Sequence, residues 1–204
     1  MGEEFEQRAA ELVDVGKVLY RQGMVPATSG NFSARLSDGT LAVTVSGRHK
    51  GRLTADDIMR VDAEGRSLDE RRPSAETLLH VQIYRRDHTA RAVLHPHSVN
   101  ATLLSKHHPG YLLLQDYELL KAFPGIDTHL CNVTVPIFEN DQNIAGLADR
   151  VDRWMKEHTD PMFGYLIKSH GFYTWGDSVE SAMRHVEAFE FLFDCEMRMR
   201  YFNH

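Results

Sequence analysis

The spacing of apolar residues along the chain predicts several helices. In the first of them Phe5, Leu12 and Leu19 lie on one face, and Gly23 provides a stop. The last is a long amphipathic pattern that closes the chain. We expect helices over residues 3–22, 73–86, 97–106, 116–121, 140–158 and 177–201.

Strands are predicted where polar and apolar residues alternate, or where turn residues bound a short apolar run. The segments ATSGNFSARL and TLAVTVSG alternate on either side of SDG, which predicts a β-hairpin. LTADDIMRVD predicts a short turn capped by Thr54 and then a strand. The apolar runs ARAVLH, NVTVPIF and FGYLIKSHG predict three more. Since strands and helices are mixed without regular βαβ alternation, we expect an α/β or α+β class around one central sheet.

Composition is typical of a folded, soluble protein. The 204 residues fit a single domain over 1–204, with 42% hydrophobic and 25% charged residues. No apolar run approaches the ~20 residues of a membrane span, and the acidic N-terminus differs from a signal peptide. Cys131 and Cys195 are too few for a disulfide framework, so we expect reduced thiols and a cytoplasmic location. A formal charge of −6 argues against non-specific nucleic-acid binding.

Two histidines lie where the apolar run ARAVLH ends. His95 and His97 flank Pro96, and side chains two residues apart on a strand share a face, roughly 6.5–7 Å apart. That spacing alone favours a pair of hydrogen-bonded surface histidines. A second apolar run, however, also ends in a histidine, His170, followed by Gly171. Three neutral imidazoles with an open position are typical of catalytic zinc, although other transition metals also bind imidazole.

The segments RPSAETLLH, AVLHPHS and SHGFYTWGDSVESA, in that order, resemble the class II aldolase family, the zinc-dependent fuculose-phosphate aldolase group. The resemblance covers about residues 5–200. It implies a three-layer α/β/α sandwich with a central mixed, largely antiparallel sheet. It also implies a homotetramer with sites at subunit interfaces, and one Zn²⁺ per subunit held by His95, His97 and His170.

Glu76 lies in the segment PSAE, where the family carries a catalytic glutamate that moves onto or off the metal. A carboxylate beside a metal-bound hydroxyl carbon is well placed to transfer a proton. Taken alone, Glu76 is more typical of an exposed helix start, where the helix dipole favours a carboxylate; the PSAE motif and His80 favour the catalytic role instead. His80, four residues later, shares its helix face and is expected to support the site or the core rather than bind metal.

Two further segments, TSGNFSAR and TVSGR, are rich in small hydrogen-bond donors. By themselves they predict only turns, because no P-loop pattern is present. The family resemblance implies that they form a phosphate site, although the chain has Ala75 where the family often has a second serine. The residues carried over are Gly30, Asn31, Ser46, Gly47 and Ser74, with Lys50 or Arg48 supplying positive charge.

Within the family, SGNFSARL, QDYELLKAF and HGFYTWGDSVESA resemble the branch that dehydrates 5-methylthioribulose 1-phosphate in methionine salvage. In that branch a glutamate matching Glu118 is the main acid/base, with Glu76 as helper, although spacing alone does not choose Glu118 over Asp116. One alternative is an aldolase or epimerase acting on fuculose or ribulose phosphate, which needs the same metal. Another is a non-catalytic interaction domain, as in the adducins.

Overall fold

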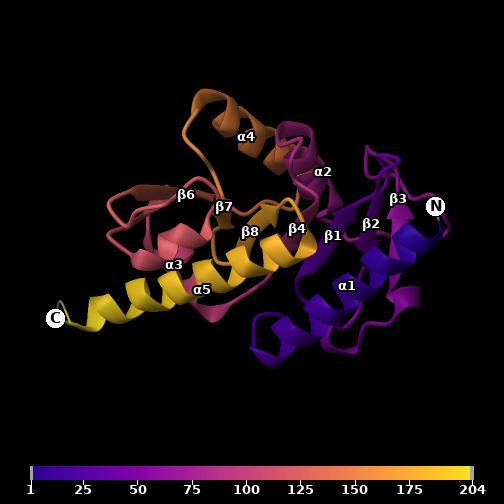
Figure 1. Cartoon of the computed structure of the whole chain (residues 1–204), viewed down its shortest axis with the longest axis horizontal. Helices are drawn as coiled ribbons and strands as arrows, with labels where there is room; N and C mark the ends of the chain where they lie inside the picture. Colours follow the sequence, from indigo (N-terminus) through magenta and orange to yellow (C-terminus); the bar gives the residue numbers. More distant parts are fainter. Residues whose placement is uncertain (1, 203–204) are drawn as a thin grey trace.

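The computed structural model describes residues 2–202, and their side chains up to residue 199. Figure 1 shows the arrangement of the elements along the chain. The helices are α1 (Gly2–Arg21), α2 (Thr77–Arg86), α3 (Val99–His107), α4 (Ile144–Glu157) and α5 (Val179–Phe202), with 3₁₀ helices η1 (Lys50–Arg52), η2 (Ala55–Asp57) and η3 (Glu118–Ala122). The strands are β1 (Asn31–Arg35), β2 (Leu41–Thr44), β3 (Ile58–Val61), β4 (Ala92–His95), β5 (Tyr111–Gln115), β6 (Asn132–Phe138), β7 (Gly164–Ile167) and β8 (Gly171–Gly176).

The strands between residues 2 and 202 form an eight-stranded sheet in the order β3-β2-β1-β4-β8-β7-β6-β5. Neighbouring strands are antiparallel except β6 and β7, which run parallel. The sheet is therefore mixed and largely antiparallel, as expected. The hairpin predicted around SDG is present as β1 and β2, and Thr54 caps η2 as predicted.

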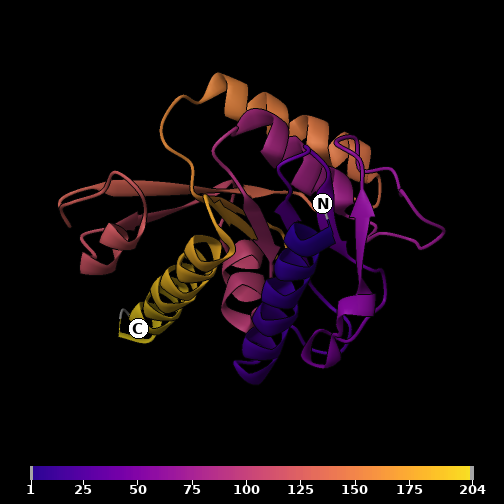
Figure 2. The ribbon, with the colours of Figure 1, turned by 45° about the vertical axis from the view of Figure 1, so that its right-hand side comes forward.

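Helices cover both faces of the sheet. α1, α3 and α5 lie on one side, and α2 and α4 lie on the other (Figures 1 and 2). Each side has its own apolar cluster, and neighbouring residues of β4 divide between them: Leu94 belongs to the cluster that contains Phe189 of α5, and Val93 to the cluster that contains Leu79 of α2. This arrangement confirms the three-layer α/β/α sandwich. Among the described residues, no helix is long and apolar enough to cross a membrane.

Two helices, α2 and α4, begin four residues later than predicted. α2 begins at Thr77 rather than Pro73, because the chain before it pairs with the end of the first hairpin. The Ser46 N–H donates to the Arg72 carbonyl at 3.0 Å, and Val45 and Pro73 form an isolated β-bridge. α4 begins at Ile144, since Asn143 caps it by accepting a hydrogen bond from Gly146 N–H. Because of its late start, α2 begins after Ser74 and Glu76, which lie in the segment that precedes it.

The sequence patterns missed two strands, β5 and β8. All six residues of β8 are buried, so it lacks the alternation that marks a half-exposed strand. β5 does alternate in burial, but its exposed positions include Tyr111 and Leu113, so polarity does not follow burial. His170 therefore lies in the turn between β7 and β8 and not at the end of a strand.

Candidate active site

Three histidines from two segments meet where the central strands β4 and β8 adjoin. His95 is the last residue of β4, His97 follows in the loop before α3, and His170 directly precedes β8. Because β4 and β8 are antiparallel neighbours, the end of β4 lies beside the start of β8. The ring centroids of His97 and His170 are 4.3 Å apart, and those of His95 and His170 are 5.1 Å apart. The structure thus brings together the three histidines that the sequence singled out.

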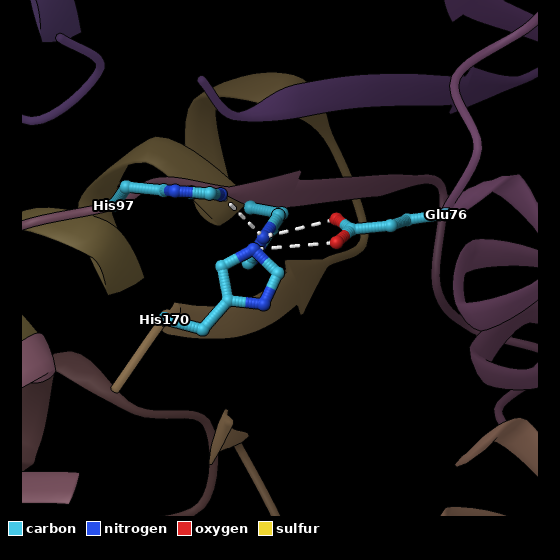
Figure 3. A group of neighbouring side chains, drawn as sticks. Glu76, His97 and His170 are labelled. Carbon is cyan, nitrogen blue, oxygen red and sulfur yellow. Dashed lines mark hydrogen bonds and ion pairs between the residues drawn. The ribbon is translucent and has the colours of Figure 1, made fainter. Parts of the chain in front are cut away.

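Glu76 faces these rings from the start of α2 (Figure 3). Its Oε2 lies 3.1 Å from Nε2 of His95, and its Oε1 lies 3.3 Å from Nε2 of His170. One ligand atom from each of Glu76, His95, His97 and His170 falls within 4.8 Å of all the others. Three imidazole nitrogens and one carboxylate oxygen can therefore share a single ion.

The protonation pattern of the histidines fits a cation. Nδ1–H of the buried His95 donates to the Phe172 carbonyl at 2.8 Å, which leaves Nε2 as a lone pair directed into the cluster. This Nε2 is 2.8 Å from Nε2 of His97. Burial lowers the pKa of His97 to about 2, so a proton on His97 is disfavoured. Converging lone pairs of this kind suit a divalent metal.

Two neighbours hold the Glu76 carboxylate in place. Its Oε2 accepts hydrogen bonds from Asn31 Nδ2 at 2.9 Å and from the Tyr173 hydroxyl at 2.8 Å. Burial alone would raise the pKa of Glu76, but its contacts with His95, His170 and Asn31 outweigh burial and keep this pKa well below its usual range. Glu76 is therefore an ionised carboxylate at neutral pH.

The sequence motifs did not predict the contact of Tyr173 with Glu76. Its ring stacks on His95, with centroids 4.0 Å apart, while its hydroxyl reaches the carboxylate. Tyr173 is the third residue of β8, so only the recognition of that strand would have placed its side chain beside the β4 end.

A pocket of about 300 Å³ opens beside the histidines. Glu76 and His97 belong to both the pocket and the cluster. All six residues of the expected phosphate site line the pocket, namely Gly30, Asn31, Ser46, Gly47, Ser74 and Lys50. Gly30 has a φ of 77°, and a Cβ there would approach the His95 carbonyl oxygen to 2.8 Å, so this position requires glycine.

Lys50 is buried and ties two loops of this pocket together. Its Nζ donates to the Thr28 carbonyl at 2.9 Å and to the Arg48 carbonyl at 2.8 Å. Burial lowers the pKa of Lys50 to about 8, although the nearby Glu76 charge opposes this. Arg48, the other candidate cation, pairs instead with Asp57 at 3.1 Å.

Glu118 is placed differently from the other predicted residues. It lies on η3, and its side chain is 72% exposed and paired with Lys121 at 2.6 Å and His129 at 3.6 Å. It belongs neither to the histidine cluster nor to the lining of the pocket.

Comparisons with known proteins agree with this geometry. The family model for the class II aldolase and adducin N-terminal domain matches residues 10–197. Proteins named methylthioribulose-1-phosphate dehydratase are 61% identical in Methylococcus capsulatus, over 96% of both chains, and 55% identical in Azotobacter vinelandii, over 95% of both. The solved L-fuculose-1-phosphate aldolase from Thermus thermophilus is 28% identical, with a TM-score of 0.77 over 97% of this chain and 98% of that chain. The chain belongs to the class II aldolase and adducin N-terminal domain family.

Proposed function

We propose that the chain is a metal-dependent hydro-lyase of methionine salvage. It converts 5-methylthioribulose 1-phosphate to 5-methylthio-2,3-dioxopentyl phosphate and water. The observation that carries this conclusion is the 61% identity, over 96% of both chains, to a protein named methylthioribulose-1-phosphate dehydratase. The geometry supports it, because a pocket lined by small donors adjoins a histidine cluster, as a phosphorylated ketose would need.

The metal in this proposal is zinc, one ion per subunit, held by His95, His97 and His170 with Glu76 beside them. Three neutral imidazoles with an open position are the donor set of many catalytic zinc sites. When bound, a divalent cation polarises the C2 ketone and stabilises the negative charge that develops on its oxygen.

The pocket beside the cluster would hold the phosphate group. The Asn31 amide and the hydroxyls of Ser46 and Ser74 can donate to phosphate oxygens, and Gly30 and Gly47 let the backbone approach closely. Lys50 adds positive charge behind these loops while it holds them together. Phosphate binding there places the ketose carbonyl towards Glu76 and His97, which border the same pocket.

Dehydration needs one base and one acid. A base removes the proton from C3, and an acid protonates the C4 hydroxyl, which leaves as water; the resulting enol rearranges to the 2,3-diketone. Glu118 is proposed as the main acid/base, with the ionised Glu76 as helper. Since Glu118 is exposed on its own chain, this role requires a neighbouring copy to present it.

The proposed assembly is a homotetramer with active sites at subunit interfaces. Large apolar side chains are exposed near the cluster: Val99, two residues after His97, is 68% exposed, and Leu103 on the same face of α3 is 44% exposed. Further exposed apolar residues are Tyr111, Leu113, Leu130 and Phe191. Such side chains are typical of surfaces that are covered in an assembly.

The free thiols of Cys131 and Cys195 support a cytoplasmic location.

The test is incubation of the purified, zinc-loaded protein with 5-methylthioribulose 1-phosphate and, separately, with L-fuculose 1-phosphate. The expected result is the diketone from the first substrate and no aldehyde from the second. Aldehyde release without diketone would assign the chain to the aldolases. No turnover of either substrate, together with no tightly bound transition metal, would assign it to the interaction domains.

A further inference from the structure

A buried chain of hydrogen bonds runs from Glu76 into the layer between β1 and α2. We propose that His80, through these hydrogen bonds, fixes the orientation of the Asn31 side-chain amide. His80 is thereby a positioning residue both for Glu76 and for the anion pocket, by which we mean the pocket lined by Asn31, Ser46 and Ser74. The inference rests on the proposed function, in which Asn31 faces the substrate phosphate.

The residues of this hydrogen-bond chain come from strand β1 and helix α2. Asn31 and Ser33 are two residues apart on β1, so their side chains point to the same face, towards α2. His80 and Tyr84 are four residues apart on α2 and share the helix face that looks back at β1. His80 is fully buried; its Nε2 contacts Asn31 Oδ1, and its Nδ1 lies 2.7 Å from Ser33 Oγ.

The Glu76 end sets the direction of the first two hydrogen bonds. The ionised carboxylate only accepts, so Asn31 must present its NH₂ group to Glu76 at 2.9 Å. The amide oxygen of Asn31 then faces His80 and needs a donor. His80 must therefore carry its proton on Nε2.

The position of this proton determines the direction of the remaining hydrogen bonds. Burial lowers the pKa of His80 to about 3, so this fully buried imidazole is neutral at neutral pH. Its Nδ1 is then an acceptor, so the Ser33 hydroxyl donates to it. The oxygen of Ser33 in turn accepts from the Tyr84 hydroxyl at 2.9 Å. Reversing the direction would set the Asn31 oxygen against the Glu76 carboxylate, and these two acceptors repel.

This direction matters for the pocket. Asn31 is 5% exposed and lines the pocket, so one of its amide hydrogens reaches Glu76 and the other is available to an anion. Without the Nε2–H of His80, the amide oxygen would be buried without a donor, which costs free energy. Rotation of the Asn31 amide would give its oxygen other neighbours, but it would turn that oxygen towards the Glu76 carboxylate and the bound anion, both of which are negatively charged.

A matched pair of variants at one position tests the role. The side-chain nitrogen of His80→Gln reaches about as far as Nε2 and can still donate to Asn31, whereas His80→Asn reaches only as far as Nδ1. The affinity of the zinc-loaded protein for inorganic phosphate is measured by calorimetry, along with zinc content, KM and kcat. We expect His80→Asn to weaken phosphate binding and raise KM by about tenfold at equal zinc content, and His80→Gln to restore most of the loss. Equal losses in the two variants, or none in His80→Asn, would overturn the inference.

A measurement on the unmodified protein covers the case in which neither variant folds. With ¹⁵N-labelled histidine, NMR reports which ring nitrogen carries the proton; we expect a neutral His80 protonated on Nε2. A proton on Nδ1, or an imidazolium at neutral pH, would overturn the inference. Neither this readout nor phosphate binding uses the ketose, so a failure to dehydrate it would refute the proposed function and leave the role of His80 standing.

Discussion

Gly171 is the position where one added methyl group should separate the three clustered histidines. It is the first residue of β8 and lies against the loop that follows β4. A Cβ at this position would lie 2.3 Å from the Pro96 carbonyl oxygen, 3.1 Å from Cε1 of His95 and 3.2 Å from the His97 Cα. Since real Cβ atoms essentially never approach within 3.0 Å, Gly171→Ala must move the two backbone segments apart by more than half an ångström.

The expected cost has two parts. Overpacking of this kind typically lowers the free energy of unfolding by about 1–3 kcal/mol, and in a domain of this size each kcal/mol lowers the melting temperature by about 2–4 °C. The same movement carries the adjacent His170 away from His95 and His97. We expect zinc affinity to fall by about 10- to 100-fold and turnover by about 100-fold.

Gly176→Ala is the matched control at the other end of β8. Its Cβ would lie 2.6 Å from the Ala182 amide nitrogen, a comparable clash on the same strand, about 17 Å from Gly171. Competition with a chromophoric chelator gives the zinc affinity of each variant, and thermal unfolding gives its stability. Both variants should melt earlier, but only Gly171→Ala should lose zinc affinity. If the two retained zinc equally well, His170 would not be a ligand positioned by β8.

Three further predictions concern proton transfer, the metal and acid. Glu118→Gln should keep its zinc while kcat falls by about 10²–10⁴-fold, because an amide cannot transfer the proton; near-normal turnover at equal zinc content would remove Glu118 from the reaction. Chelation of the metal should abolish turnover and lower the melting temperature, since a ligand present at about 1,000 times its Kd contributes about 4 kcal/mol; a melting temperature insensitive to zinc would contradict a site formed by folding. His80 takes up a proton near its ordinary pKa of 6.5 when unfolded but only near 3 when folded, so the free energy of unfolding should fall as pH drops through that window, by roughly 1.4 kcal/mol per unit from this group. Urea unfolding at two pH values within the window should show a shallower dependence for His80→Gln, and identical slopes for the two proteins would refute this.

Local periodicity explains which parts of the candidate site could be predicted from the sequence. His95 and His97 lie together because of their spacing at a strand end, whereas their approach to His170 depends on the pairing of β4 with β8. That pairing joins segments about 75 residues apart, and no spacing reveals it; the histidine at the end of a second apolar run and the family resemblance pointed to His170, but not to this pairing. The buried run of β8 carries no period of two, so the strand that holds Tyr173 was missed as well.

Other features depend on the environment of a side chain and not on its position in a pattern. From the sequence alone we expect Lys50 to be a free cation. In the structure it is buried, and its ammonium group donates to the backbone carbonyls of Thr28 and Arg48. The family resemblance makes Glu118 a candidate acid/base, but the ionic partners that residues 2–199 give its side chain are Lys121 and His129. Its proposed role remains a prediction, because it depends on contacts between copies of the chain.

One pair of residues in the sheet joins the two halves of the candidate site. Asn31 and His95 are direct partners in the antiparallel pairing of β1 and β4, so their side chains emerge on the same face. Asn31 lines the pocket and His95 belongs to the histidine cluster. The Glu76 carboxylate contacts both of these side chains. A shift of this register by one residue would turn the Asn31 side chain to the opposite face and break both contacts at once. In the proposed function, the distance between the substrate phosphate and the metal would therefore be set by backbone pairing in the middle of the sheet, where it is least able to change.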